Sequence, residues 1–279
     1  MAALVSAVAA LAGTAPAASA DHGITLLASQ RLDSRLLDLT LSTPALGTPT
    51  HVRVLLPARY REQKPRRYPV LYLLHGSFDD YRSWTDKGAV ESITGHRKLI
   101  VVMPDGGQGG WYTNWVNRGQ GGPPEWETFH IQQLIPWIDD RYRADRSRGA
   151  RGIAGLSMGG FGAMTYAARH PDLFSWAGSF SGAVDIVNYA PVAVVIDTGN
   201  GQPGPLDPPG RPFDPIENGV ETMSVSLHQR LLSLGIPHTW DDYGPGIHSW
   251  PYWQRDLIEA LPSVMRTFNA NRKAKRRHP

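Results

Sequence analysis

The sequence predicts an α/β domain with a mostly parallel central sheet flanked by helices. Short apolar runs typical of buried parallel strands alternate with helical stretches, and they span residues 69–74, 99–103, 151–156, 176–181 and 192–196. A Gly-Leu-Ser-Met-Gly turn at 155–159 joins one of these runs to a helix-like segment. A strand, a tight turn and a helix in this order expose a serine at the carboxyl edge of a sheet.

The N-terminal part of the chain predicts antiparallel strands at the sheet edge. Residues 23–31 and 35–42 alternate in hydrophobicity and indicate a hairpin, and a further strand is expected at 50–56. The sequence contains no internal repeat. A single α/β domain is therefore expected over residues 21–270.

The glycine-rich turn is typical of a nucleophile elbow. Gly155 and Gly159 leave room for a tight backbone turn around Ser157, whose hydroxyl is the candidate nucleophile. The helix behind the serine supplies a positive dipole and free N–H groups where an oxyanion would form. The Met158 N–H, directly after the serine, is the first candidate donor.

His248 is the candidate general base. It lies in a glycine-rich loop after the strand-like segment 238–243 and before a last helix expected from about residue 251. This chain order, serine before histidine, is typical of α/β-hydrolases. Four other histidines follow the elbow. His170 lies at a helix stop and His228 in an expected helix. His238 opens a strand-like segment, and His278 lies in the tail.

Several motifs together resemble one family. They lie at 73–76, 79–84, 102–108, 111–115, 126–129, 155–160, 199–201 and 248–253. In these motifs the chain resembles the esterase D-like branch of the α/β-hydrolases. It is most similar to the secreted mycolyltransferase (antigen 85) group and its actinobacterial esterase relatives. The resemblance covers roughly residues 50–265 and implies an α/β-hydrolase fold.

The resemblance implies further site residues. It puts Glu217 on the acid that the mycolyltransferases use, whereas Asp214 and Asp207 are the alternatives. It also puts Ser77, in the loop after the strand at 69–74, on the second oxyanion donor. His75, next to this loop, is expected to be structural. Candidate substrate contacts, all aromatic, are Phe78, Trp84 and Trp250.

The chain departs from the family pattern in two places. After Gly182 and Asp185 the family inserts several tens of residues that wall one side of the acyl cleft, but here only 186–191 precede the next strand. Phe78 stands where the mycolyltransferases carry an arginine that helps hold the polar acceptor. A phenyl ring cannot replace a guanidinium in that role. Both departures argue against mycolyl transfer and leave ester cleavage open.

Export is expected from the first twenty residues. They are small and apolar and end in Ala-Ser-Ala, which is typical of a signal peptide cleavage site, although a basic n-region is missing. The chain has no cysteine and no His-Glu-x-x-His pattern. We therefore expect a secreted protein that needs no metal and no cofactor.

The basic charge is concentrated at the C-terminus. The net charge of +3 includes five basic side chains after residue 271, so the rest of the chain sums to +3 − 5 = −2. Residues 271–279 are interpreted as a solvated basic tail, or as an electrostatic contact with an anionic cell envelope. No aromatic and basic stripe accompanies the tail, so nucleic-acid binding is not expected.

The sequence therefore predicts a secreted serine esterase that acts on small-molecule or lipid esters. One alternative is an acyltransferase, similar to the mycolyltransferases, that acylates a sugar or glycerol hydroxyl. Another alternative is a non-catalytic protein that binds wall or matrix. Two loops are expected near the site. One is the aromatic and glycine-rich segment 106–124, and the other is the irregular segment 199–215, which is expected to carry the acid.

Overall fold

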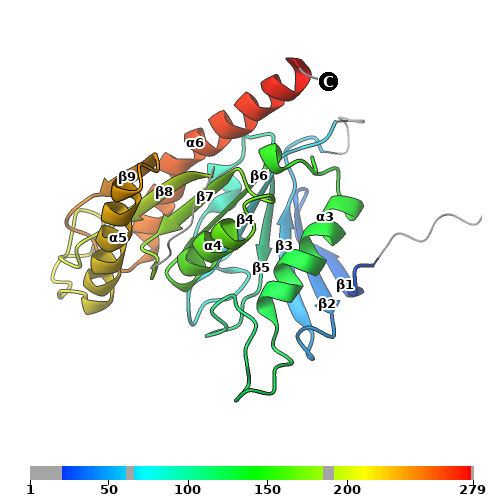
Figure 1. The fold of residues 1–279 in the computed structure, drawn as a ribbon, viewed down its shortest axis with the longest axis horizontal. Coiled ribbons are helices and arrows are strands. Elements are labelled where there is room, and N and C mark those ends of the chain that lie inside the picture. The colour runs from blue at the N-terminus through cyan, green and yellow to red at the C-terminus, as the bar shows by residue number, and fades with distance from the viewer. Residues whose placement is uncertain (1–20, 61–65, 185–191, 278–279) are drawn as a thin grey trace, which may run out of the picture.

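The computed structural model describes residues 21–60, 66–184 and 192–277. The predicted signal peptide at 1–20 and the short connection at 186–191 lie outside the described residues. In the described part, one sheet of nine strands has the order β1-β2-β3-β5-β4-β6-β7-β8-β9 (Figure 1). The strands are β1 Thr25–Arg31, β2 Leu36–Ser42, β3 Thr50–Leu55, β4 Val70–Leu74, β5 Ile100–Pro104, β6 Arg151–Leu156, β7 Trp176–Phe180, β8 Ala193–Thr198 and β9 His238–Asp242.

Strand pairing confirms the predicted architecture. β1 and β2 form an antiparallel hairpin at one edge, and β3 continues the antiparallel pairing to β5. From β5 through β9 all neighbouring strands are parallel. Parallel strands end at the same edge, so the loops after β4, β5, β6, β7 and β8 meet there.

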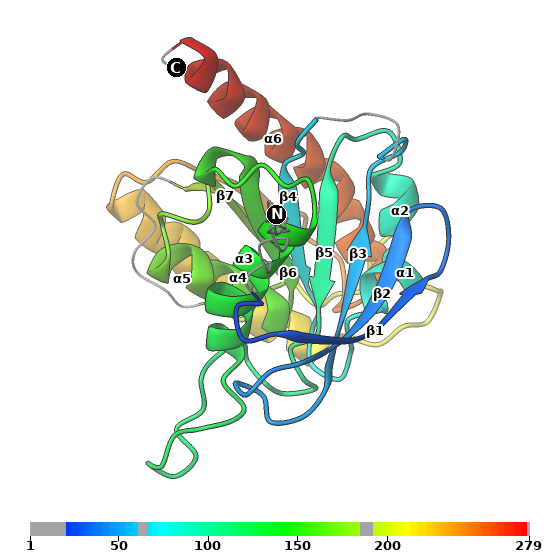
Figure 2. The ribbon, with the colours of Figure 1, turned by 90° about the vertical axis from the view of Figure 1, so that its right-hand side faces the viewer.

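Helices cover both faces of the sheet (Figures 1 and 2). The helical segments are α1 Ser83–Asp86, α2 Val90–Ile93, the π-helical η1 Thr128–Leu134, α3 Ile135–Arg141, the 3₁₀ turn η2 Arg148–Ala150, α4 Met158–Arg169, α5 Pro215–Ser233 and α6 Trp250–Arg277. Val70, Tyr72 and Leu74 of β4 pack in the core under α3, α4 and α5. Leu71 and Leu73, which point the other way, pack under α1, α2 and α6.

Helix α6 corrects the predicted C-terminal boundary. The helix runs from Trp250 to Arg277 and passes residue 270 without a break, so the first part of the basic segment is helical. Leu257, Leu261, Val264 and Phe268 form its buried stripe against the sheet. The end of α6 extends beyond the sheet (Figure 1).

Helix α5 is longer than the sequence predicts. Periodicity indicates a helix at 224–234, whereas α5 begins at Pro215. The acid was expected on the irregular loop at 199–215, whereas Glu217 lies in the first turn of α5. No helix within the described ranges is both long enough and apolar enough to cross a membrane.

Candidate active site

Ser157 occupies a strained turn at the carboxyl end of β6. Its φ of 51° and ψ of −120° lie outside the regions that non-glycine residues usually adopt. The Ser157 N–H donates to the Phe180 carbonyl over 3.0 Å, which fixes the turn to β7. Such backbone strain costs about 1–3 kcal/mol and is concentrated at functional sites.

Both glycines of the elbow are required by close backbone contacts, as predicted. A Cβ on Gly155 would clash with the backbone of Gly159, and a Cβ on Gly159 would clash with the Leu74 and His75 carbonyls. α4 can therefore start directly behind the serine and lie against the end of β4.

The structure brings Glu217 and His248 together. Glu217 Oε2 lies 2.7 Å from His248 Nδ1, although the two residues are on α5 and on the loop between β9 and α6. An ionised carboxylate only accepts hydrogen bonds, so this contact requires the proton of the neutral imidazole on Nδ1. Nε2 is then left as the hydrogen-bond acceptor, which is the form that a general base needs.

The second oxygen of Glu217 is held by the ends of two strands. Oε1 accepts from Ser181 Oγ at 2.8 Å and from the Gly199 N–H at 2.7 Å, with Thr198 Oγ1 at 3.4 Å. The Glu217 side chain is fully buried. Hydrogen bonds to both oxygens stabilise a buried carboxylate and fix its orientation toward the imidazole.

Asp214 joins the acid helix to the histidine loop. Its Oδ1 accepts from the N–H groups of Ile216 and Glu217 at 2.9 and 3.3 Å and so caps α5. Its Oδ2 accepts from the His248 backbone N–H at 3.1 Å. Asp214 therefore contacts the main chain of His248, whereas Glu217 contacts the ring.

Asp207, the remaining alternative acid, lies elsewhere. Its Oδ2 accepts from the Gly204 N–H at 2.7 Å and from the Tyr252 hydroxyl at 2.9 Å. These bonds fasten the loop after β8 to α6. Of the three acids that the sequence leaves open, only Glu217 touches the His248 imidazole in this structure.

We expect Asp214→Asn to lower kcat by about 10- to 100-fold, since a displacement near 1 Å can cost about 10² in rate. Asparagine also caps helices well, so α5 should keep its start. However, asparagine has one acceptor oxygen where aspartate has two. When that oxygen caps α5, the His248 N–H faces an NH₂ group and has no acceptor. Steady-state kinetics and the melting temperature measure the two effects separately. Wild-type turnover in Asp214→Asn would show that this link does not position His248.

The other downstream histidines have partners away from the elbow. His170 Nε2 lies 2.8 Å from Glu127 Oε1. His228 and His238 contact each other at 2.8 Å between ring nitrogens. Neither arrangement places an imidazole next to Ser157, which leaves His248 as the candidate base among the described histidines that follow the elbow.

His75 is a structural histidine in this fold. Its ring is buried, its Nδ1 lies 2.8 Å from the Gly76 carbonyl, and its Nε2 accepts from the Gly106 N–H at 2.9 Å. Asp105 Oδ1 lies 3.2 Å from the same Nε2. The ring fastens the loops after β4 and β5.

The Ser77 and Met158 N–H groups, the predicted oxyanion donors, belong to segments that lie next to Ser157. A Cβ on Gly76 would come within 3.3 Å of Ser157 Cβ, so the loop that carries Ser77 lies against the serine. Met158 is the first residue of α4 and follows the serine directly. Among the described residues, neither the Ser77 nor the Met158 N–H donates to a protein acceptor. Both are available to a ligand.

Ser157 and His248 are not hydrogen-bonded to each other. Both residues are described, and no hydrogen bond joins the Ser157 hydroxyl to the His248 ring in this structure. Such bonds are often long in the absence of substrate and tighten in the complex. The Trp253 ring packs edge-on against His248 with 5.0 Å between centroids.

The three predicted substrate contacts have different environments. Phe78 is 87% exposed and has a φ of 63°, and its N–H donates to the Gln108 carbonyl at 3.0 Å. Trp250 is partly buried at the start of α6. Trp84 is buried, with its indole N–H donating to Leu74 O at 3.0 Å. The Trp84 ring packs in the core against Trp250, with 5.2 Å between ring centroids, so in this structure it presents almost no surface to a substrate.

Sequence reasoning missed the residues that hold the candidate acid and base. Ser181 and Gly199 bind Glu217, and Trp253 packs on His248. One signal was available, since Ser181 is the last residue of the predicted strand at 176–181 and Gly199 comes three residues after the one at 192–196. Trp111 was also missed, whose N–H donates to Met158 Sδ at 3.4 Å and whose ring packs on Phe161.

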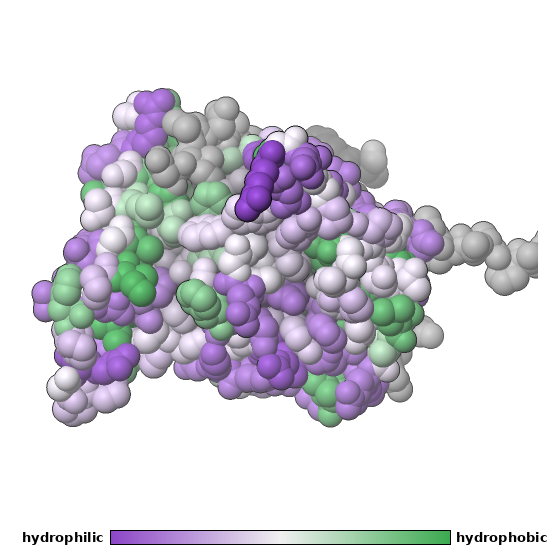
Figure 3. Space-filling model, turned by 90° about the horizontal axis from the view of Figure 1, so that it is seen from below, coloured by the Kyte–Doolittle hydropathy of each residue, from purple (hydrophilic) through white to green (hydrophobic). Residues whose placement is uncertain are grey.

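Figure 3 views the molecule from below, the side toward which β5 points in Figure 2. Hydrophobic and hydrophilic side chains are interspersed on this face. Large exposed apolar side chains on the loops after β4, β5 and β8 include Phe78, Trp111, Trp115, Val116 and Phe213. The candidate site is therefore surrounded by loops that offer apolar contact surface.

The strand order, the serine turn behind β6 and the helices on both faces define an α/β-hydrolase fold. The chain belongs to the family described as "Putative esterase", which matches residues 43–216. These findings confirm the fold class and the predicted family resemblance.

Sequence relatives include esterases and acyltransferases. The chain is 41% identical over 189 residues to Esterase Rv1288 of Mycobacterium tuberculosis (strain ATCC 25618 / H37Rv), which covers 64% of this chain and 41% of that protein. It is 28% identical over 253 residues to the diacylglycerol acyltransferase/mycolyltransferase Ag85B of Mycobacterium leprae (strain TN). This match covers 72% of this chain and 77% of that protein. The chain thus spans less than half the length of its esterase relative.

Solved structures share the fold. A ferulic acid esterase matches with a TM-score of 0.70 at 25% identity, over 84% of this chain and 98% of that one. Mycobacterium tuberculosis MPT51 matches with a TM-score of 0.64 at 20% identity, over 82% and 97%. The second likeness bears on the fold alone.

Proposed function

We propose that the chain is a serine esterase that hydrolyses carboxylic esters through an acyl-enzyme. The observation that carries the proposal is the 2.7 Å contact between buried Glu217 and His248, at the sheet edge where the Ser157 turn lies. A glutamate held in this way fixes the imidazole tautomer in which Nε2 can accept a proton. Family membership and the esterase relatives support the same reaction.

In the proposed mechanism, His248 Nε2 takes the proton of Ser157 as the serine oxygen attacks the ester carbonyl. The carbonyl oxygen becomes an oxyanion, which the N–H groups of Met158 and Ser77 stabilise. His248 then gives its proton to the leaving alcohol, and the acyl group stays on Ser157. Water, deprotonated by His248, attacks the acyl-enzyme, and the proton returns to Ser157 as the acid leaves. Glu217 stabilises the imidazolium in each half of the reaction.

Acyl transfer to a sugar or glycerol hydroxyl is the second candidate function, and the 28% identity to a mycolyltransferase favours it. It differs from hydrolysis only in the hydroxyl that attacks the acyl-enzyme. A product assay with a panel of acyl esters, with and without trehalose or glycerol, tests the proposal. Free acid as the main product supports hydrolysis, whereas acylated trehalose or glycerol supports transfer.

A non-catalytic wall- or matrix-binding role is a third candidate. The Glu217–His248 contact and the open N–H groups beside Ser157 argue against it, because a binding protein needs neither. Retention on cell-wall material with no turnover of any ester in the panel would favour this role over the esterase.

We expect kcat/KM to peak at acyl chains of about two to six carbons. Each buried methylene contributes about 0.8 kcal/mol, and the gain ends where the chain leaves the protein. Because only residues 186–191 connect Asp185 to the next strand, we propose that less protein surface lines a long acyl chain. Phe78 offers no cation to a sugar acceptor. Nitrophenyl esters of increasing length measure the preference. A kcat/KM that keeps rising through long acyl chains, or trehalose esters as the main products, would favour mycolyl transfer over hydrolysis.

Export from the cell is also part of the proposal. It depends on residues 1–20, which have the composition of a signal peptide, and on a reaction that needs no cofactor. A fusion of residues 1–20 to a reporter enzyme tests export without reference to the esterase reaction.

A further inference from the structure

Two adjoining hollows lie at the amino edge of the parallel sheet. One, of about 330 Å³, is bordered by the segments before β4 and β5 and by α6. The other, of about 260 Å³, is bordered by the segment before β6 and by α6. Arg272 lines both hollows. We refer to the two hollows together as the basic groove.

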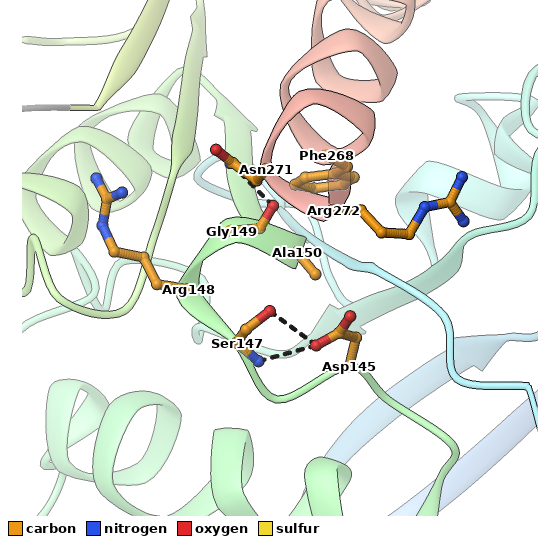
Figure 4. Close-up of a pocket in the computed structure, with 8 residues that line it drawn as sticks. All are labelled: Asp145, Ser147, Arg148, Gly149, Ala150, Phe268, Asn271 and Arg272. Carbon is orange, nitrogen blue, oxygen red and sulfur yellow. Dashed lines mark hydrogen bonds between the residues drawn. The ribbon is translucent and has the colours of Figure 1, made fainter. Parts of the chain in front are cut away.

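The groove is strongly positive. The basic residues that line the first hollow are Arg66, His96, Arg97, Lys98 and Arg272, and no acidic residue of the described ranges lines it. In the second hollow, Figure 4 shows Arg148 and Arg272 on opposite sides. Among the residues that the structure describes, the one acidic residue lining the groove is Asp145, which already accepts from the N–H and the hydroxyl of Ser147 at 3.1 and 2.7 Å.

The cations at the centre of the groove are not neutralised by neighbours. Arg97, Lys98 and Arg272 are exposed, and none of them takes part in an ion pair with another described residue. Within the described ranges, the side chain of Arg272 donates to one acceptor, the neutral Asn269 Oδ1 at 3.2 Å. Exposed like charges repel one another, so a cluster of this kind favours an anionic ligand.

The shape of the groove is fixed by the docking of α6. Asn271 Nδ2 donates to the Gly149 carbonyl at 3.0 Å, as Figure 4 shows, and Phe268 beside it is buried. The helix therefore holds Arg272 between the two hollows. A ligand meets a preformed arrangement of charges and does not have to order a loose tail.

We propose that the basic groove binds a linear polyanion that carries repeated phosphate groups. Guanidinium groups match pairs of phosphate oxygens, and each hollow is large enough for one phosphate ester. A chain of phosphates can occupy both hollows in succession, with Arg272 contacting two units. Several weak contacts made by one polymer add up to useful affinity.

The lining favours a polymer over a lipid surface. A helix that binds a bilayer presents an exposed apolar face to it. Here the apolar side chains of α6 that border the groove, Met265 and Phe268, are partly or fully buried. These two side chains therefore give a bilayer no exposed apolar face to insert into.

The position of the groove leaves the candidate active site open. Strand β6 has six residues between the groove at its amino end and Ser157 at its carboxyl end, a separation of roughly 20 Å. A polymer bound in the groove would hold the protein with its catalytic edge turned away. The inference is independent of the esterase proposal, since it involves no residue of the candidate site.

Binding of the full chain to long-chain inorganic polyphosphate tests the inference. The variant removes three groove charges, as Arg97→Ala, Lys98→Ala and Arg272→Ala together. The matched control removes three exposed arginines elsewhere, as Arg31→Ala, Arg211→Ala and Arg230→Ala. We expect the groove variant to bind about tenfold more weakly or worse and the control to bind nearly as the wild type does. The slope of log K against log salt should fall by about two in the groove variant alone.

Three results would contradict the inference. They are no binding of polyphosphate by the wild type, equal losses in the groove variant and the control, and tighter binding to anionic lipid vesicles than to polyphosphate. Turnover of a soluble short ester, measured in parallel, is expected to be the same in the groove variant as in the wild type. Ser157→Ala should still bind polyphosphate, so failure of the esterase proposal would not affect this test.

Discussion

Ser157→Ala is expected to lower the turnover of a short-chain nitrophenyl ester by about 10⁴- to 10⁶-fold, because no other group replaces the nucleophile. The protein should stay folded. The serine hydroxyl makes no hydrogen bond in the described structure, and the turn is held by backbone contacts to Phe180 and Phe161. Initial rates and the melting temperature, measured on the same preparation, separate loss of chemistry from loss of structure.

Ser77→Ala provides the matched control. Ser77 is proposed to act through its backbone N–H, which alanine keeps, so this variant should retain most of the wild-type turnover. A large loss in Ser77→Ala would assign a role to its hydroxyl. More than trace activity in Ser157→Ala would contradict the serine mechanism itself.

Glu217→Gln is expected to lower kcat by about 10⁴-fold, as loss of the triad carboxylate does in serine proteases through the wrong imidazole tautomer. Glutamine is nearly isosteric, so one oxygen can still accept from Ser181 and Gly199. Its amide then faces His248 Nδ1 as a donor, and the imidazole proton moves to Nε2. The base can no longer accept the proton of Ser157.

The three acids should rank in a fixed order. Asp207→Asn changes the link between the loop after β8 and Tyr252 of α6, which does not contact His248, and should change turnover least, whereas Asp214→Asn should give an intermediate loss. Steady-state rates of all three variants on one ester measure the order. Similar activity in the three, or a larger loss at Asp214 than at Glu217, would contradict the assignment of the acid.

The sheet and the elbow could be predicted because their signals are local. Apolar runs define β4 through β8 within one or two residues of the observed bounds, and glycines mark the turn around Ser157. The start of α5 could not be predicted in the same way. Its inward positions include Glu217 and Ser224, which are polar, so the apolar repeat of the helix begins only farther along the chain.

Contacts between segments that are distant in the chain could not be predicted from the sequence. The bond from His248 to Asp214 joins residues 34 positions apart, and its direction depends on how two loops meet. Trp84 shows a related limit. A tryptophan in a family motif can line a site or fill the core, and only its burial under Trp250 decides between the two. The basic segment after residue 271 carried no signal that α6 would continue into it.

Labelling with a fluorophosphonate tests the central claim most directly, because this reagent phosphonylates an activated serine. Trypsin cleaves after Arg151 and Arg169, and Ser157 is the only serine in the peptide 152–169. We expect mass spectrometry to find a single adduct, on Ser157, that forms much more slowly in His248→Ala and in Glu217→Gln. No adduct on the folded wild-type protein, or an adduct on another residue, would contradict the proposal that Ser157 is the nucleophile.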